Sequence, residues 1–287
     1  MTKIKYSAVL SAIILSTSCA FAQSSFEPET AMSAQESLDS TYTQQIQNLV
    51  NQSTCFKYSW KNRGRAPAGY MRGVALSFAR SLCRAKANSP SGLAKILSSA
   101  AGSSSKDALA YFKSAFSAMG VAINTSGEED VRAVYTLGMG LGMRESSGEY
   151  CTGWDTTAGS NRPSAEAEAG PFQTSYDSMS ASPELAKLYQ EYQANPQNCL
   201  LNVYKVGSSC AKQSILGTGA GAAYQVFNKS CPAFATEYAM TLLRLVRSHF
   251  GPINRKEAEV VPSCNSLLSS VQQMIDQNPQ DSCAELL

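Results

Sequence analysis

The sequence is poor in histidine, in net charge and in long apolar runs. Its one histidine, His249, excludes metal sites built on two or three histidines and leaves little scope for histidine-based catalysis. Lys and Arg number 24 against 22 Asp and Glu, and Lys3 and Lys5 belong to an N-terminal segment that we expect to be removed, so the mature chain is formally neutral. A neutral chain is not expected to bind nucleic acid, because binding to phosphates needs an excess of cations.

The N-terminus has the pattern of an export signal. Lys3 and Lys5 precede a short apolar run, and Ala20-Phe21-Ala22 fits the small-x-small rule for cleavage after Ala22. The run is far shorter than the roughly 20 apolar residues that a membrane span needs, and no later segment is long enough. We therefore expect a signal peptide over residues 1–22 and a mature protein that is secreted or periplasmic and is not inserted in a membrane.

Eight cysteines remain after signal removal, and this even number predicts disulfides. Four bridges are the simplest arrangement in an exported chain, although about 105 connectivities are possible. No pair has C-x-x-C spacing and only one histidine is present, so we do not expect a metal cluster. We also expect no cofactor. Full pairing also leaves no obvious thiol for a cysteine peptidase that would use His249. The eight are Cys55, Cys83, Cys151, Cys199, Cys210, Cys231, Cys264 and Cys283.

Helical periodicity dominates the rest of the chain, and strand-type alternation is nearly absent. Residues 23–45 are polar with little to bury, which indicates a flexible leader. We predict a mainly α fold with at most a small hairpin, in which a helical region at 46–125 packs on a domain at 126–287. Apolar residues recur at helical spacing within 66–86, 109–119, 131–141, 185–192, 234–245 and 268–275.

Two local patterns refine this prediction. Ser104 with Asp107, and Ser126 with Glu129, fit the capping box that begins a helix. Residues 148–180 are rich in Gly, Ser, Thr and Pro, so we expect a long loop there, with room for one short hairpin.

Glu145 lies where a catalytic acid would be expected. It ends an apolar helix and is followed by a Gly-rich loop, so its carboxyl should face the core on one side and a cleft on the other. Burial raises the pKa of a carboxyl group, and an acid still protonated near neutral pH can protonate a leaving oxygen. The alternative is a solvated helix-end acid that pairs with Arg144, the commoner role of a lone Glu.

An ordered set of motifs resembles the goose-type lysozymes and the soluble lytic transglycosylases. Glu145-Ser146 matches the E-S motif that ends the catalytic helix of those enzymes. Gly170-Pro171-Phe172-Gln173 matches their Gly-Leu-Met-Gln segment, with Pro171 and Phe172 in place of the usual Leu and Met. Gly153-Trp154-Asp155 is similar to the segment that holds a water-positioning acid, and Ala222-Ala223-Tyr224-Gln225 is similar to the Ala-Tyr-Asn motif. The resemblance covers about residues 128–250.

The resemblance implies a lysozyme-like fold with its catalytic domain at 126–287. It also implies a lysozyme-type glycosidase that cleaves the β-1,4 bond between the amino sugars of peptidoglycan. Glu145 would be the general acid and Asp155 the acid that holds the attacking water. The partner would be the glycan strand, bound by a monomer. Residues 168–175 and 231–234 look like a group of exported bacterial lysozymes that includes enzymes acting on deacetylated peptidoglycan. The implied substrate contacts come from Ser146, Phe172, Gln173, Tyr224 and Gln225.

The identity of the second acid stays open in the sequence. Ser175 occupies the place where goose-type enzymes often carry Asp, and Asp155 could equally cap the turn that follows it. Glu166, Glu168 and Asp177 are the other candidates. Two other functions also stay open: a lytic transglycosylase, which uses the same Glu but forms 1,6-anhydro ends, and a catalytically inactive wall-binding protein.

Overall fold

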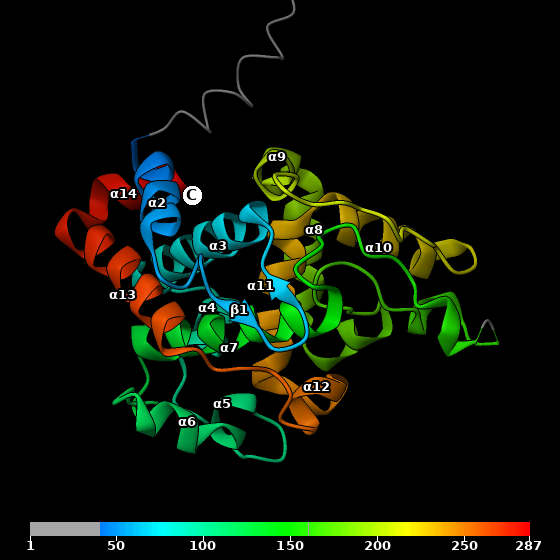
Figure 1. The fold of residues 1–287 in the computed structure, drawn as a ribbon, viewed down its shortest axis with the longest axis horizontal. Coiled ribbons are helices and arrows are strands. Elements are labelled where there is room, and N and C mark those ends of the chain that lie inside the picture. The colour runs from blue at the N-terminus through cyan, green and yellow to red at the C-terminus, as the bar shows by residue number, and fades with distance from the viewer. Residues whose placement is uncertain (1–40, 160) are drawn as a thin grey trace, which may run out of the picture.

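The computed structural model describes residues 41–287 except residue 160, and within them the fold is mainly helical, as predicted (Figure 1). The helices of eight residues or more are α2 (Thr41–Gln52), α3 (Ala68–Lys86), α7 (Glu128–Ser146), α8 (Pro183–Ala194), α10 (Gly219–Ser230), α11 (Pro232–Leu245), α13 (Pro262–Gln277) and α14 (Pro279–Leu286). The shorter ones are α4 (Gly92–Ser98), α5 (Ala108–Tyr111), α6 (Lys113–Ala118), α9 (Leu201–Tyr204) and α12 (Gly251–Asn254).

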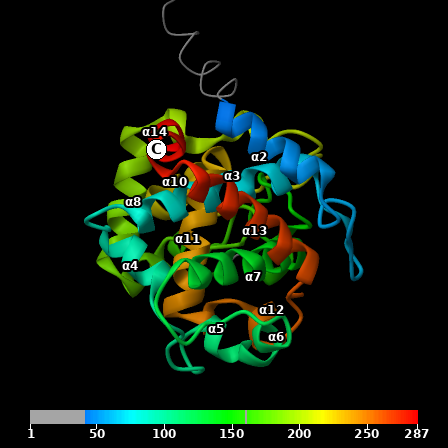
Figure 2. The same ribbon diagram turned by 90° about the vertical axis from the view of Figure 1, so that its left-hand side faces the viewer.

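The core is built on α3 and α7. The predicted stripe of α3, which includes Tyr70 and Phe78, is fully buried, and α3 contacts α7, α11 and α13 (Figures 1 and 2). The regions 46–125 and 126–287 therefore share one hydrophobic core, because α3 belongs to the first and its three partners to the second.

A small antiparallel hairpin joins α2 to α3. Its strands are β1 (Ser59–Trp60) and β2 (Gly64–Arg65), with Ser59 opposite Arg65. The predicted position of a hairpin within residues 148–180 is wrong: the described part of that segment holds short 3-10 turns and one isolated bridge, between Ala169 and Thr174. Strands of two residues are too short to produce the alternation that reveals a strand in the sequence.

Four disulfides form, as predicted, and they use all eight described cysteines. Two of them tie the N-terminal part of the chain to α13 and α14, and the other two close loops around the region of Glu145 and α11. The pairs are Cys55–Cys264, Cys83–Cys283, Cys151–Cys210 and Cys199–Cys231. No described cysteine is left for a peptidase.

Both predicted capping boxes are wrong. The N-cap of α5 is Asp107 itself, whose carboxylate accepts a hydrogen bond from Leu109 N at 2.9 Å. The Ser126 hydroxyl accepts from Ala100 N, at 3.0 Å, and Glu129 accepts from Ala122 N, at 3.2 Å. The same residue types thus tie neighbouring loops to the helix starts, which a local sequence pattern does not distinguish from capping.

The expected leader ends earlier than residue 45. α2 begins at Thr41, and Glu285 accepts hydrogen bonds from the backbone of Tyr42 and Thr43. The predicted signal peptide and the rest of the leader lie outside the described residues. Among the residues described, no helix is long and apolar enough to cross a membrane.

Candidate active site

Glu145 lies in the last turn of α7, where the chain turns sharply. Ser147 and Gly148 both have positive φ, of 58° and 77°, and their N–H groups bond back to the carbonyls of Met143 and Gly142. This ending satisfies the last carbonyls of the helix and directs the chain away from its axis. The Glu145 side chain is left half-buried at the edge of a hollow of about 370 Å³.

The Glu145 carboxyl has no hydrogen-bond or ion-pair partner among the described residues. Burial, followed by the nearby charge of Glu168, raises its pKa from 4.5 to about 8, against the opposing effects of Arg255 and Arg63. The group therefore stays protonated at neutral pH and is free to donate its proton to a bound molecule.

Arg144 does not pair with Glu145. Its guanidinium donates to Glu257, at 3.3 Å, and to the Lys61 carbonyl, at 3.4 Å. The alternative role of Glu145, a solvated acid paired with Arg144, is therefore not observed. The two side chains leave the helix in different directions.

Ser146 connects the end of α7 to the Gly170–Gln173 motif. The Ser146 hydroxyl donates to the Pro171 carbonyl at 2.8 Å, so the 170–173 segment is held beside Glu145. Gly170 has a φ of +79°, and a Cβ there would lie 2.0 Å from the Asn228 side-chain oxygen. Gln173 folds back, and its amide donates to the Gly170 carbonyl at 2.9 Å. The motif is a tight turn closed by its own glutamine.

The five expected sugar contacts are all buried, so that expectation needs correction. Phe172 is 1% exposed and lies against Tyr70, and Tyr224 and Gln225 are both 0% exposed. The Tyr224 hydroxyl lies 2.9 Å from the Thr174 hydroxyl, and Gln225 bonds only to backbone groups. Ser146 and Gln173 are each 8% exposed, and although Ser146 lines the hollow at Glu145, the five side chains together offer little surface to a glycan.

Asp155 occupies an exposed turn. Its carboxylate accepts from Thr157 N, at 3.0 Å, and from the Thr157 hydroxyl, at 2.7 Å, and these bonds lower its pKa. It caps the short 3-10 helix Thr156–Ala158, which is the turn role that the sequence left open. Asp155 does not line the hollow at Glu145, nor a second hollow, described below, that is lined by Glu168 and His249. Its role as water-holding acid stays a prediction.

Glu168 is the acidic residue whose charge does most to raise the pKa of Glu145. Burial raises the pKa of Glu168 to about 7, with smaller contributions from Asp177 and Asp155 against the lowering effect of Arg162. The side chain remains 41% exposed, so solvent screens part of this effect. The pKa of Glu168, about 7, is lower than that of Glu145, about 8, and the charge of Glu168 contributes to the rise at Glu145.

His249 lies beside Glu168 without forming a close pair. Its Nε2 atom is 3.8 Å from a Glu168 oxygen, and burial lowers the pKa of the imidazole. A neutral imidazole does little to hold Glu168 in its charged form. Both side chains line a hollow of about 490 Å³ with Arg162, Ser175 and Asp177.

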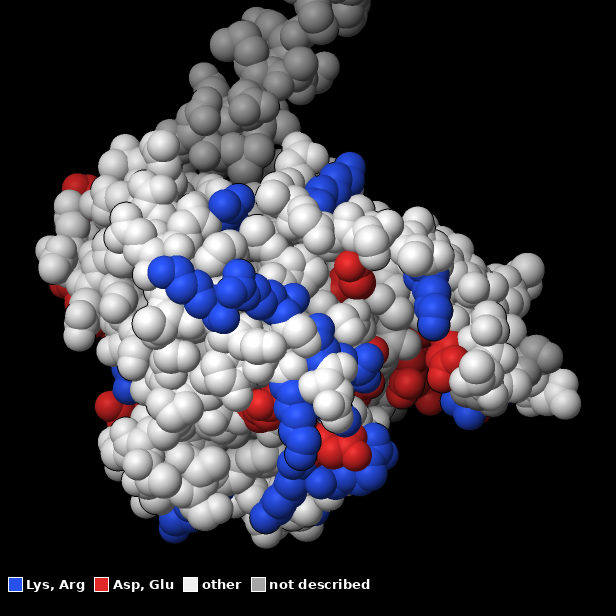
Figure 3. All heavy atoms as spheres, viewed as in Figure 1, with Lys and Arg blue, Asp and Glu red and all other residues white. Residues whose placement is uncertain are grey.

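Acidic side chains gather in a depression between the body of the molecule and the lobe that carries α10 (Figure 3). One wall of the hollow at Glu145 is the loop 209–212, which the sequence did not single out. Cys151–Cys210 fixes this loop, and Glu149 accepts hydrogen bonds from the backbone N–H groups of Ser209 and Cys210. Glu149 lies four residues after Glu145, a proximity that could have drawn attention to it.

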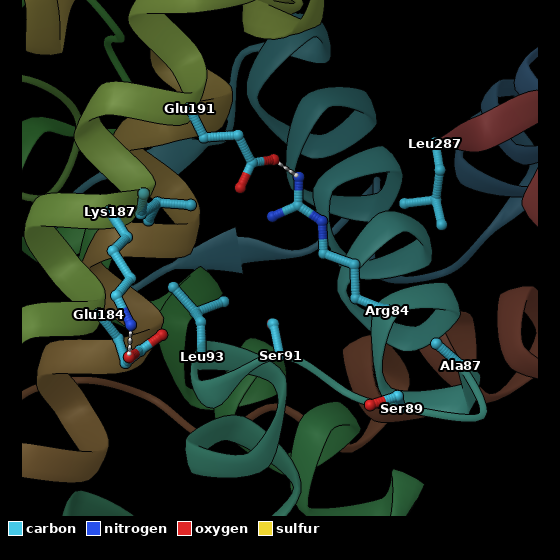
Figure 4. A pocket seen from close by; sticks show the side chains of 10 residues that line it. Arg84, Ala87, Ser89, Ser91, Leu93, Glu184, Lys187, Glu191 and Leu287 are labelled. Atoms are coloured by element: carbon cyan, nitrogen blue, oxygen red, sulfur yellow. Dashed lines mark hydrogen bonds and ion pairs between the residues drawn. The ribbon is translucent and has the colours of Figure 1, made fainter.

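A further hollow, of about 350 Å³, lies between α3 and α8 and includes the C-terminal Leu287 (Figure 4). Its charges are already paired. Arg84 donates to Glu191, at 2.5 Å, and to the buried Glu237, at 2.6 Å, and Lys187 pairs with Glu184. These bonds join neighbouring helices and engage the charged side chains that line this hollow, whereas the Glu145 carboxyl has no partner among the described residues, so the hollow at Glu145 is the stronger candidate site.

Comparison of the chain with protein families, with curated proteins and with solved structures finds no match in any of the three.

Proposed function

We propose that the protein is an exported peptidoglycan glycosidase of the lysozyme type, with Glu145 as its general acid. The observation that carries the proposal is the Glu145 carboxyl itself, which is half-buried, unpaired among the described residues and lines a hollow. Its pKa of about 8 suits an acid that protonates a glycosidic oxygen at neutral pH. The ordered motifs that resemble goose-type lysozymes supply the substrate class. All eight described cysteines are paired, which is in keeping with export.

Glu168 supports the hydrolytic form of the reaction. An inverting glycosidase needs a carboxylate opposite the acid to activate water. Glu168 ionises below Glu145 and is close enough to raise its pKa, whereas Asp155 is engaged by Thr157. We therefore propose Glu168 as the base, and keep Asp155 as the alternative that the sequence nominates.

The test is digestion of purified peptidoglycan, both native and chemically deacetylated, with mass spectrometry of the soluble products. Hydrolysis gives reducing ends, whereas a lytic transglycosylase gives 1,6-anhydro ends that are lighter by one water. Comparison of the two substrates shows whether acetylation of the sugars matters. Binding without any soluble product would instead favour the inactive wall-binding protein.

A pair of variants assigns the second acid. Glu168→Gln should lower the hydrolytic rate by about 10²-fold or more, because general-base catalysis is worth that much. Asp155→Asn removes a carboxylate of the same region and serves as the matched control. A large loss in Asp155→Asn with little loss in Glu168→Gln would reverse the assignment.

A further inference from the structure

Charge is separated along the described chain. Residues 41–106 contain ten Lys and Arg and no Asp or Glu, whereas residues 107–287 contain more acids than bases. The near-neutral total therefore conceals a basic region, and such a region attracts anionic partners even when the whole protein is neutral.

The basic residues of this region come to the surface at the hairpin. Lys57, Lys61, Arg63 and Arg65 are all exposed, and the ammonium or guanidinium group of each has no carboxylate within 4.0 Å among the described residues. Figure 3 shows basic side chains in a band across the face on which Figure 1 places the hairpin. We call residues 57–65 the basic hairpin.

The basic hairpin is fixed against the end of α7. Arg63 donates to the Arg144 carbonyl at 2.5 Å, and Glu259 accepts from Lys61 N at 2.9 Å and from the Tyr58 hydroxyl at 2.8 Å. These bonds engage the Arg63 guanidinium, the Tyr58 hydroxyl and the backbone of Lys61, and they leave the Lys61 ammonium free among the described residues. A cationic segment held in one conformation binds an anion with less loss of conformational entropy than a mobile one.

One end of the basic hairpin reaches the proposed active site. Arg63 lines the same hollow as Glu145, with Lys212 on the loop that forms another wall. The guanidinium of Arg63 is also close enough to oppose the rise in the pKa of Glu145. An anionic group next to the cleaved bond would therefore lie closest to Arg63. An anionic chain attached there would run from Arg63 towards Lys61 and Arg65.

We propose that the basic hairpin binds the carboxylates of the peptide stems that project from the glycan strand beside the bond cut at Glu145. The inference rests on the proposed function, and it names the substrate as stem-bearing glycan. A stem of about four extended residues spans roughly 13 Å, which allows its carboxylates to lie along a hairpin of this size. Exposed Lys and Arg bind carboxylates through charge-assisted hydrogen bonds.

The experiment compares Lys61→Gln/Arg65→Gln with Lys95→Gln/Lys113→Gln, which removes two exposed cations that do not line the hollow. Three soluble glycans are digested: stem-bearing, stem-bearing with its carboxylates converted to amides, and stripped of stems by an amidase. The hairpin variant should raise KM about two- to tenfold on the first only, with kcat unchanged, since each exposed pair is weak. Added salt should reduce the difference. The control should match the wild type throughout.

Three outcomes overturn the inference. They are an unchanged KM on stem-bearing glycan, an equal rise on all three glycans, and a loss of binding to phosphatidylglycerol vesicles with no change on glycan. The last would make the hairpin a membrane-binding surface. Sedimentation with insoluble stem-bearing and amidated peptidoglycan measures binding without cleavage. Failure of the wild type to release any product would therefore count against the proposed function alone.

Discussion

Glu145→Gln should make the protein more stable at neutral pH. The carboxyl has a pKa of about 8 in the folded protein against an ordinary value of 4.5. Between these values the folded state holds a proton that the unfolded chain has lost, so the free energy of unfolding falls as the pH rises from about 4.5 to about 8. Glutamine does not ionise, so the stability of the variant does not fall over this pH range on account of residue 145.

The structure sets the size of the effect. The wild type loses about 1.36 kcal/mol of unfolding free energy for each pH unit between the ordinary pKa of 4.5 and the working pH of 7. The loss that the variant avoids is therefore at most about 3 kcal/mol. Solvent reaches one side of the half-buried group and reduces this figure. We therefore expect the variant to exceed the wild type by about 1–3 kcal/mol at pH 7.

Urea denaturation of both proteins at a series of pH values between 4 and 9 isolates the contribution of Glu145. The difference should be near zero at pH 4, grow up to about pH 8 and then level off. Glu257→Gln is the control of opposite sign, because Arg255 and Arg144 lower the pKa of Glu257. That variant should be less stable than the wild type at neutral pH, and the difference should vanish as the pH falls, because the wild type then loses the contribution of the ionised Glu257. A Glu145→Gln difference that is independent of pH, or a less stable variant at pH 7, would refute the reasoning.

Three further predictions concern the same region. The profile of kcat/KM against pH should be a bell with its limbs near 7 and 8, because Glu168 must be ionised and Glu145 protonated; a rate that keeps rising above pH 9 would contradict this. Gly170→Ala should cost about 2 kcal/mol or more in thermal unfolding, because its φ is +79° and its Cβ would lie 2.0 Å from a side-chain oxygen; an unchanged melting temperature would show that the turn can relax. Cys151→Ala/Cys210→Ala should lower the free energy of unfolding by about 2–4 kcal/mol, measured in urea, because the bridge closes a loop with a sequence separation of 59.

The helices that the sequence predicted well are those with a continuous apolar stripe. The stripe of α3 recurs every four residues from Tyr70 to Leu82, and α3 packs against several helices, among them α7, α11 and α13. Helix α14 is short, with little periodicity, and it was missed. Helix α10 was also missed, because Gly219 and Gly221 resemble a turn. In the structure a Cβ at Gly221 would lie 2.3 Å from the backbone of Ala165, so this glycine allows a close approach between segments far apart in the chain.

The site was predictable as far as it is local. Glu145 and Ser146 lie in one helix turn, and their position before a Gly-rich loop indicates both burial and a nearby hollow. The proximity of Glu168 to Glu145 depends on the turn at Gly170 and on the bond from Ser146 to Pro171, which only the folded chain shows. The buried aromatics misled the prediction because an aromatic residue in a motif looks the same whether it faces a cleft or supports it from behind.

The most direct test of the central claim is the release of soluble fragments from purified peptidoglycan by the wild type and by Glu145→Gln. The amide is nearly isosteric with the acid but cannot donate the catalytic proton, so the variant should stay folded and lose at least about 10²-fold in rate. Circular dichroism confirms the fold, and Glu149→Gln, an acid of the same hollow, provides the matched comparison. Wild-type rates from folded Glu145→Gln would contradict the account.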